Sequence, residues 1–249
     1  MPKSFIILIL LTGVVYLVVL AGTALNQRRM IYLPSHHEPE SDLEPWVLGD
    51  VTIGYGRLAA DPAVVWLFLH GNAGQASGRA YAMSRFMPDD SVYVVEYPGY
   101  GRRPGKPTKE SLDRAAEEAY RELRRRYPGV PVCVVGESLG SGPAAVLGAL
   151  TDPPDKIILL VPFDELANVA GERMPFLPVR WLLIDNWDNA EALRGFAGPI
   201  EIYGAAQDEI IPVGQARALA ASLPRAVYHE LEGTHNDWST DERVGFRFP

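Results

Sequence analysis

A five-residue motif near the middle of the chain constrains the fold more than any other feature. An apolar run at Val132–Val135 leads into it, small residues follow it, and its members are Gly136, Glu137, Ser138, Leu139 and Gly140. This is the strand–turn–helix setting that a G-x-S-x-G motif needs to present a serine at the end of a sheet. The glycines remove side chains where strand and helix must pack closely. The motif also occurs by chance in Gly/Ser-rich loops, but the apolar run before it and the small residues after it favour the strand–turn–helix.

Short apolar segments alternate with helical patterns over the rest of the chain. We expect strands at Val51–Tyr55, Val64–Leu69, Val92–Glu96, Val132–Gly136, Ile157–Val161, Ile200–Tyr203 and Ala226–Leu231. Several are apolar throughout, which is typical of strands covered on both faces. Helices are expected at Gly78–Met87, Lys109–Tyr127, Leu139–Leu150 and Gln215–Leu223. The alternation predicts an α/β fold with a mostly parallel central sheet flanked by helices.

Residues 162–198 interrupt this alternation. They contain Met174-Pro175-Phe176-Leu177-Pro178 and the apolar run Trp181-Leu182-Leu183-Ile184. We expect a small inserted cap over the carboxyl edge of the sheet, where sheets of this class bind ligands. The apolar run is equally compatible with a place in the core.

The N-terminus carries an uncharged segment from Phe5 to Leu25, 21 residues long. A helix of that length, at about 1.5 Å per residue, just spans a bilayer core of about 30 Å. The alternative is a cleaved signal peptide with Gly22 and Ala24 at its cleavage site, but the apolar cores of signal peptides usually run about 7–15 residues. We therefore predict a single-pass membrane anchor over residues 1–29. Flanking basic residues are nearly balanced and leave its orientation open.

A single folded domain is expected over residues 30–249, with residues 34–46 as a surface linker. The net charge of −8 offers no basic surface for nucleic acid. The one cysteine, Cys133, lies in an apolar run and is expected to be buried and inert. No spacing of cysteine and histidine resembles a zinc site. The expected partners are the membrane and a small-molecule or acylated substrate; the oligomeric state is left open.

An acid and a base follow the serine in the order that this strand–turn–helix motif requires, Ser then Asp or Glu then His. Asp208 lies just after the strand at Ile200–Tyr203, and a carboxylate there can accept from a histidine Nδ1–H. Glu209, its neighbour, is the competing acid. His235 lies in a loop after the last strand and is the expected base. The other histidines, His36, His37, His70 and His229, are interpreted as structural or as part of the linker.

Two backbone N–H groups are candidates for an oxyanion hole. Leu139 follows the serine at the start of a helix, where the helix dipole favours negative charge. The second donor comes from the loop after the strand at Val64–Leu69, and Asn72 is the candidate there. Because Asn72 is expected to act through its main chain, an alanine at this position is expected to cost little activity.

Together these motifs resemble the Bem46-like group of α/β hydrolases, which are often described as serine-aminopeptidase-like or dienelactone-hydrolase-like. The resemblance covers about Met30 to Asp237 and depends on an ordered set of motifs: Met30–Pro34, His70–Gly74, Tyr97–Gly101, Gly136–Gly140, Asp208 and Gly233–Asp237. It implies an α/β-hydrolase fold, an N-terminal anchor and an esterase, thioesterase or lipase type of activity. It also implies a full helix after the histidine, whereas residues 236–249 are polar before Phe246 and Phe248.

The expected function is therefore hydrolysis of a carboxylic ester, thioester or amide by Ser138, Asp208 and His235 through an acyl-enzyme, without a cofactor or metal. Two alternatives stay open. One is a serine peptidase, although no amine- or carboxylate-binding pocket is recognisable. The other is a non-catalytic membrane scaffold that retains the fold, although such proteins typically lose a member of the triad.

Overall fold

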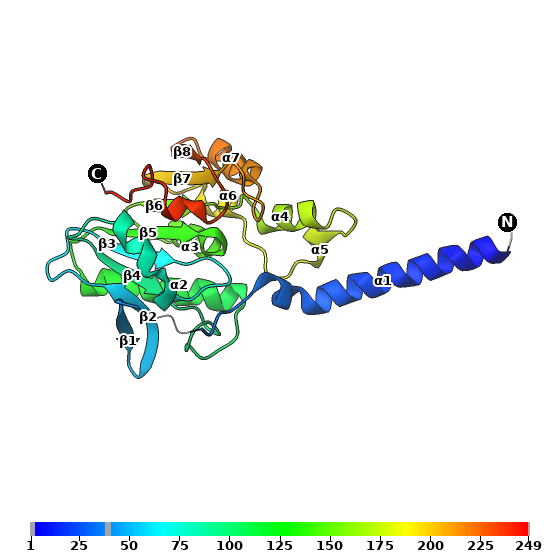
Figure 1. Ribbon diagram of the computed structural model, residues 1–249, viewed down its shortest axis with the longest axis horizontal. Helices are drawn as coiled ribbons and strands as arrows, with labels where there is room; N and C mark the ends of the chain where they lie inside the picture. The colour runs from blue at the N-terminus through cyan, green and yellow to red at the C-terminus, as the bar shows by residue number, and fades with distance from the viewer. Residues whose placement is uncertain (1–2, 38–40, 249) are drawn as a thin grey trace.

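An eight-stranded sheet forms the centre of the protein in the computed structural model, which describes residues 3–37 and 41–248 (Figure 1). The strand order is β1-β2-β4-β3-β5-β6-β7-β8; the pairs β1–β2 and β2–β4 are antiparallel and the remaining pairs are parallel. The strands are β1 Glu44–Leu48, β2 Val51–Arg57, β3 Val65–Leu69, β4 Ser91–Val95, β5 Val132–Glu137, β6 Ile157–Leu160, β7 Ile200–Ala205 and β8 Ala226–Leu231. The predicted α/β fold with a mostly parallel sheet is confirmed.

Alternate residues of the central strands serve two hydrophobic cores, one on each face of the sheet. In β3, Val65, Leu67 and Leu69 face one core, while Trp66 and Phe68 face the other. The helices α2 Lys109–Arg126, α3 Ser141–Gly148, α6 Asn189–Leu193 and α7 Val213–Ser222 cover the first face. The second is covered by the 3-10 helices η1 Ala76–Arg85 and η3 Asp237–Ser239 together with the C-terminal tail.

The sequence prediction differs from the structure mainly at the first strand and at two helices. Strand β1 lies partly inside the predicted linker 34–46, whose residues 38–40 are outside the described part of the chain. Only Trp46 of β1 is buried, so the strand lacks an alternating apolar pattern. The predicted helix at Gly78–Met87 is a 3-10 helix. The helix after the motif begins with the short 3-10 helix η2, Ser138–Gly140, before α3.

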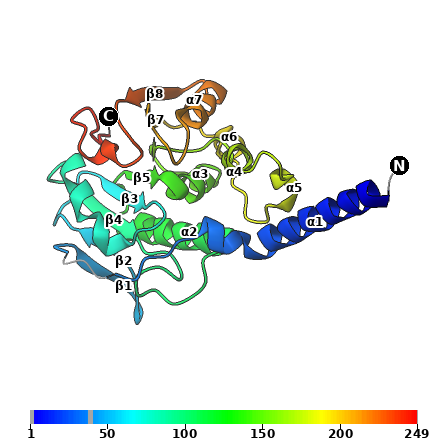
Figure 2. The ribbon, with the colours of Figure 1, turned by 45° about the vertical axis from the view of Figure 1, so that its right-hand side comes forward.

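The N-terminal helix α1, Lys3–Ile31, projects away from the sheet and its helices (Figure 1). It is long and apolar enough to cross a membrane by length and composition, and none of its most apolar stretch is buried. The helices α4 Leu166–Arg173 and α5 Val179–Leu182, from the predicted cap, lie beside its C-terminal part in both views (Figure 2). The end of the predicted cap belongs to the sheet layers, because Asn189 of α6 donates to Ser141 Oγ of α3 at 3.1 Å.

Aromatic side chains of the C-terminal tail occupy the sheet face next to the histidine loop. Trp238 and Phe246 are fully buried and contact the rings of Phe68 and Trp66, respectively. The Arg85 guanidinium donates to the carbonyl of Ser239 at 2.9 Å and holds the start of the tail. Burial of these rings therefore supports the histidine loop where the family resemblance implied a full helix.

Candidate active site

Ser138 sits at the tight turn between β5 and α3, in a backbone conformation that side chains rarely adopt. Its φ is +51°, in the left-handed region, and such strain persists only where the surrounding structure imposes it. A Cβ atom at Gly140 would lie 2.1 Å from the carbonyl oxygen of Leu69, and one at Gly136 would lie 2.6 Å from Ala144 Cβ. Both glycines are thus required by close approach, which fixes the serine at the carboxyl end of the sheet.

A chain of hydrogen bonds joins Ser138, His235 and Asp208, three residues from three separate post-strand segments. His235 Nε2 lies 2.9 Å from Ser138 Oγ, and His235 Nδ1 lies 2.7 Å from Asp208 Oδ2. All three side chains are almost completely buried. With Nδ1 donating to the carboxylate, Nε2 is left as the acceptor that can take the serine proton.

The Asp208 carboxylate is held in place from both of its oxygens. While Oδ2 accepts from His235, Oδ1 accepts from the backbone N–H of Ile210 at 2.9 Å and of Ile211 at 2.7 Å. The competing acid Glu209 is exposed, and the hydrogen bonds of the His235 ring go to Asp208 and Ser138 instead. The geometry therefore distinguishes Asp208 from its neighbour, which the sequence alone left open.

Glu137, the variable residue of the motif, ties the turn to the loop after β3. Its buried carboxylate accepts from Gly71 N at 2.9 Å and forms an ion pair with Arg79 Nε at 3.0 Å. His70, in the same loop, is buried, and its Nε2 lies 3.4 Å from Glu96 Oε1. The Tyr97 hydroxyl donates to the carbonyl of His70 at 3.0 Å. The His70 side chain thus has a structural setting, in agreement with the sequence interpretation.

Asn72 and Leu139 both line the cavity next to Ser138, as an oxyanion hole requires. The Asn72 side chain, in addition, bonds to the end of α1, a role that the sequence analysis missed. Its Nδ2 donates to the carbonyl of Ile31, and its Oδ1 accepts from Leu33 N and from Tyr100 OH, both at 2.9 Å. The loop that carries the candidate oxyanion donor is therefore bound to the N-terminal helix.

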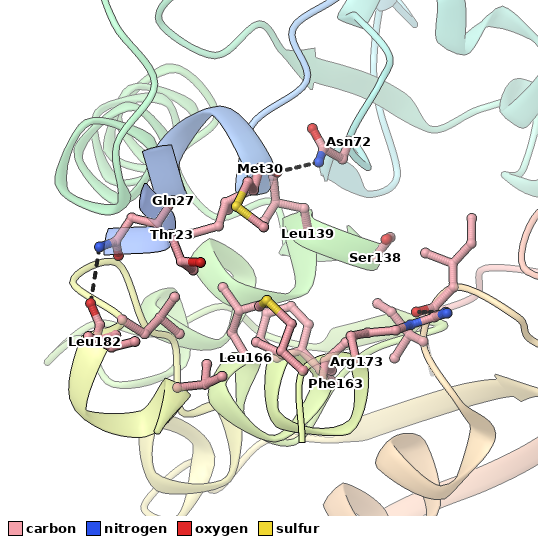
Figure 3. Close-up of a pocket in the computed structure, with 18 of the residues that line it drawn as sticks. Thr23, Gln27, Met30, Asn72, Ser138, Leu139, Phe163, Leu166, Arg173 and Leu182 are labelled. Atoms are coloured by element: carbon pink, nitrogen blue, oxygen red, sulfur yellow. Dashed lines mark hydrogen bonds between the residues drawn. The ribbon is translucent and has the colours of Figure 1, made fainter. Parts of the chain in front are cut away.

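A cavity of about 380 Å³ extends from Ser138 between α1 and the cap (Figure 3). Ser138 lies at one end, and Gln27 and Leu182 lie at the other. Its lining is mostly apolar and comes from α1, α4, α5 and neighbouring loops: Thr23, Ala24, Gln27, Met30, Ile31, Asn72, Leu139, Phe163, Leu166, Val169, Ala170, Arg173, Met174, Val179, Leu182, Leu183, Ile210 and Ile211. The size is within the range of about 300–1,000 Å³ that ligand pockets occupy.

Polar contacts hold α1 against the cap along this cavity. Gln27 Nε2 donates to the carbonyl of Leu182 at 3.0 Å, and Gln27 Oε1 accepts from Ile184 N at 2.7 Å. The buried Asp185 accepts from Arg28 Nε and from Tyr32 OH, both at 2.9 Å. Burial and the Asp185 charge hold the pKa of Tyr32 well above its usual value, so its hydroxyl stays protonated and donates.

Arg173 joins the cap to the loop of the candidate acid. Among the described residues that line the cavity, it is the one with a charged side chain. Its guanidinium donates to the carbonyl of Glu209 and, at 3.1 Å, to that of Ile210. Among residues 3–37 and 41–248, no group of three or more His, Cys, Asp or Glu side chains is arranged to hold a metal ion. Cys133 is buried, and burial raises the pKa of its thiol.

Comparison with known proteins identifies the family. A sequence profile described as the alpha/beta hydrolase family matches residues 66–245. An uncharacterized protein of Mycobacterium tuberculosis is 31% identical over 236 residues, covering 85% of this chain and 81% of that protein. The chain therefore belongs to the alpha/beta hydrolase family. Membership of the Bem46-like group within it stays a prediction.

Two further similarities concern lipases. The lysophosphatidylserine lipase ABHD12 of Mus musculus is 27% identical over 183 residues, covering 65% of this chain but only 46% of that protein. Among solved structures, a monoacylglycerol lipase of Paleococcus ferrophilus matches with a TM-score of 0.54 and 17% identity, covering 73% of this chain and 92% of that one. At that identity the structural similarity shows the fold alone.

Proposed function

We propose that this protein is a membrane-anchored serine hydrolase that cleaves an acyl ester or thioester through an acyl-enzyme. The observation that carries the proposal is the pair of hydrogen bonds at His235, 2.9 Å to Ser138 and 2.7 Å to Asp208. Ser138 Oγ attacks the substrate carbonyl while His235 Nε2 takes its proton, and Asp208 stabilises the resulting imidazolium. The backbone N–H groups of Leu139 and Asn72 bind the oxyanion.

His235 then donates this proton to the leaving alcohol or thiol, which departs as the acyl-enzyme forms. In the second half of the reaction, His235 takes a proton from the incoming water, whose oxygen attacks the acyl carbon, and returns that proton to Ser138 Oγ as the acid is released. No step requires an electron acceptor or a metal, so the chemistry can be carried by the side chains and backbone of this chain.

The cavity supports an acyl group as the part of the substrate that is bound. Its walls are formed by apolar side chains such as Met30, Phe163, Leu166 and Val169, which favour a hydrocarbon chain over a polar one. A relative that is a lipase by name supports the same substrate class. A peptidase that recognises a free amine needs a carboxylate, and the described lining contains none.

The proposal is tested with the full-length protein and a fluorophosphonate probe. We expect covalent labelling that is absent in Ser138→Ala. In a separate assay, the unlabelled protein should hydrolyse p-nitrophenyl esters or acyl thioesters of graded chain length. Mass spectrometry after brief exposure to a p-nitrophenyl ester should place the acyl group on Ser138. An adduct on another residue overturns the mechanism, and a folded protein that neither labels nor hydrolyses any of these substrates favours the non-catalytic scaffold.

A further inference from the structure

Residues 174–184, which run from the end of α4 to two residues past α5, have an exposed apolar surface, and we name them the cap loop. Phe176, Trp181 and Ile184 are 86%, 90% and 69% exposed. Arg180 is the one charged residue of the segment, and its guanidinium is paired with Glu165. Exposed apolar side chains of this size, grouped in one short segment of a folded protein, are typical of a surface that another apolar phase covers.

The cap loop lies along α1 rather than beyond it. Tyr16 OH donates to the carbonyl of Phe176 at 3.1 Å, while Gln27 binds the carbonyl of Leu182 at 3.0 Å. Tyr16 lies nine residues before Leu25, the end of the uncharged segment, which corresponds to about 14 Å of helix at about 1.5 Å per residue. A helix that crosses the bilayer over Phe5–Leu25 therefore carries Phe176 below the membrane surface.

The backbone of the cap loop is suited to a medium without water. The N–H groups of Leu177, Val179, Trp181, Leu182 and Leu183 all donate to carbonyls within residues 174–183. Ile184 N donates to Gln27 Oε1, and Pro175 and Pro178 have no N–H to satisfy. A non-helical segment is tolerated at membrane depth when its polar groups are paired with protein, and in this one only the N–H groups of Phe176 and Arg180 lack a protein acceptor among the described residues.

We propose that the cap loop inserts into the lipid leaflet beside α1 and is a second membrane contact of this protein. Trp181 precedes Leu182, whose carbonyl is bound by Gln27, and Gln27 lies just past the uncharged segment of α1. Trp181 is therefore at the level of the lipid interface, where tryptophan is preferred. Phe176, at the level of Tyr16, reaches the acyl chains. The occupant of this surface is thus bilayer lipid, continuous with the lipid around α1.

This placement has a consequence for the substrate, and that consequence rests on the proposed function. Leu182 lines the cavity from the cap and Thr23 lines it from α1, toward the end remote from Ser138 (Figure 3). That end lies between two elements that are both embedded in the leaflet. The acyl chain of a membrane amphiphile enters the cavity there and extends toward Ser138, without passing through water.

Tryptophan fluorescence tests the insertion directly, because Trp181 is 90% exposed whereas Trp46, Trp66, Trp187 and Trp238 are at most 4% exposed. The full-length protein is reconstituted in phosphatidylcholine vesicles whose acyl chains carry bromine at carbons 6 and 7. We expect brominated lipid to quench a component of the emission that is absent in Trp181→Phe. Acrylamide, a quencher in the aqueous phase, should reach that component poorly in vesicles.

Depth is tested by moving the probe within the same loop. In the double variant Trp181→Phe, Phe176→Trp, bromine at carbons 11 and 12 should quench more strongly than at carbons 6 and 7, whereas the wild type should show the reverse order. Strong acrylamide quenching of Trp181 without bromine quenching would mean that the loop lies in water. Protection from both quenchers would mean that protein, such as a second copy of the chain, covers it.

Either of those results overturns the insertion. The fluorescence measurement does not depend on catalysis, so a protein that fails every hydrolase assay but is quenched as expected contradicts only the proposed function. Conversely, Ser138 labelling by the fluorophosphonate together with an aqueous Trp181 contradicts only the insertion.

Discussion

The Asn72 side chain donates a hydrogen bond to the carbonyl oxygen of Ile31, the last residue of α1. The loop with the candidate oxyanion donor and the N-terminal helix are thus one connected unit. Tyr100 and the backbone of Leu33 complete the contacts of this side chain, each at 2.9 Å. The position of the donor near Ser138 therefore depends on a helix that is far from it in the sequence.

This contact changes the expected effect of a substitution at Asn72. From the sequence, Asn72→Ala should cost little, but loss of the side chain frees the loop from α1. We now expect kcat to fall about tenfold, the equivalent of about 1.4 kcal/mol, with KM for a short ester little changed. Tyr100→Phe removes one of the contacts and should have a smaller effect. Wild-type kcat in Asn72→Ala would mean that the main chain alone matters.

The hydrogen bonds of Asp208 predict unequal roles for the two adjacent acids. Asp208→Asn should lower kcat by about 10⁴-fold, because an amide at this position favours the wrong histidine tautomer. Glu209→Gln is the matched control, since its exposed side chain does not contact His235, and its kcat should stay near the wild-type value. Steady-state hydrolysis of a p-nitrophenyl ester measures both. The reverse ranking would transfer the role to Glu209.

Ser138 and His235 should act as a unit. In the proposed mechanism the proton passes along the 2.9 Å hydrogen bond between them, so removing either partner removes the same step. Ser138→Ala, His235→Ala and the double variant should therefore lose similar activity, whereas independent roles would give losses that multiply. Single-turnover rates with a p-nitrophenyl ester compare all three.

Gly140 should tolerate no side chain. A Cβ atom would lie 2.1 Å from a backbone carbonyl of β3, so Gly140→Ala should destabilise the protein by about 1–3 kcal/mol or more. Gly171, inside α4 with nothing within 4 Å of its virtual Cβ, provides the control. Gly171→Ala should stabilise the protein by about 0.5–1 kcal/mol. Thermal unfolding in one detergent ranks the two variants, and equal midpoints would contradict the proposed close packing.

A larger side chain in the cavity should shift the preferred acyl length. Ala170 lines the cavity from α4, and Ala170→Phe fills part of the space next to Leu166 and Val169. We expect the ratio of kcat/KM for a dodecanoyl ester to that for a butanoyl ester to fall about tenfold or more, since each excluded CH₂ contributes about 0.8 kcal/mol of binding. An unchanged ratio would mean that the acyl chain binds elsewhere.

Most strands and the positions of Ser138, Asp208 and His235 were predictable because local patterns determine them. Each of the three residues follows the end of a strand in the parallel part of the sheet, and the carboxyl ends of parallel strands meet at one edge of a sheet. Strand β1 was not predictable, because a short edge strand with Glu44 and Pro45 buries only Trp46. The 3-10 geometry of η1 likewise has no distinct sequence pattern.

The contacts between α1, the cap and the oxyanion loop were beyond the sequence for a different reason. Gln27, Arg28, Asn72 and Asp185 are polar residues whose partners across these contacts lie as far as 157 positions away. A single sequence contains no signal for such pairs. The exposed Trp181 is a related case, because an apolar run that is buried in a core and one that is exposed on a surface have the same sequence pattern. Only the packing of the cap against α1 separates the two.

The cavity wall formed by Thr23, Ala24, Gln27, Met30 and Ile31 gives the N-terminal helix two tasks at once. These positions share one side of the helix, so that side determines the shape of the cavity, and in the proposed anchor the other sides meet lipid. For the proposed anchor, exchanging this helix for another of equal hydrophobicity would preserve membrane attachment but would change the cavity wall and with it the substrate specificity. A soluble version cut after Arg29 would lack part of that wall, and its kinetics would describe a different enzyme.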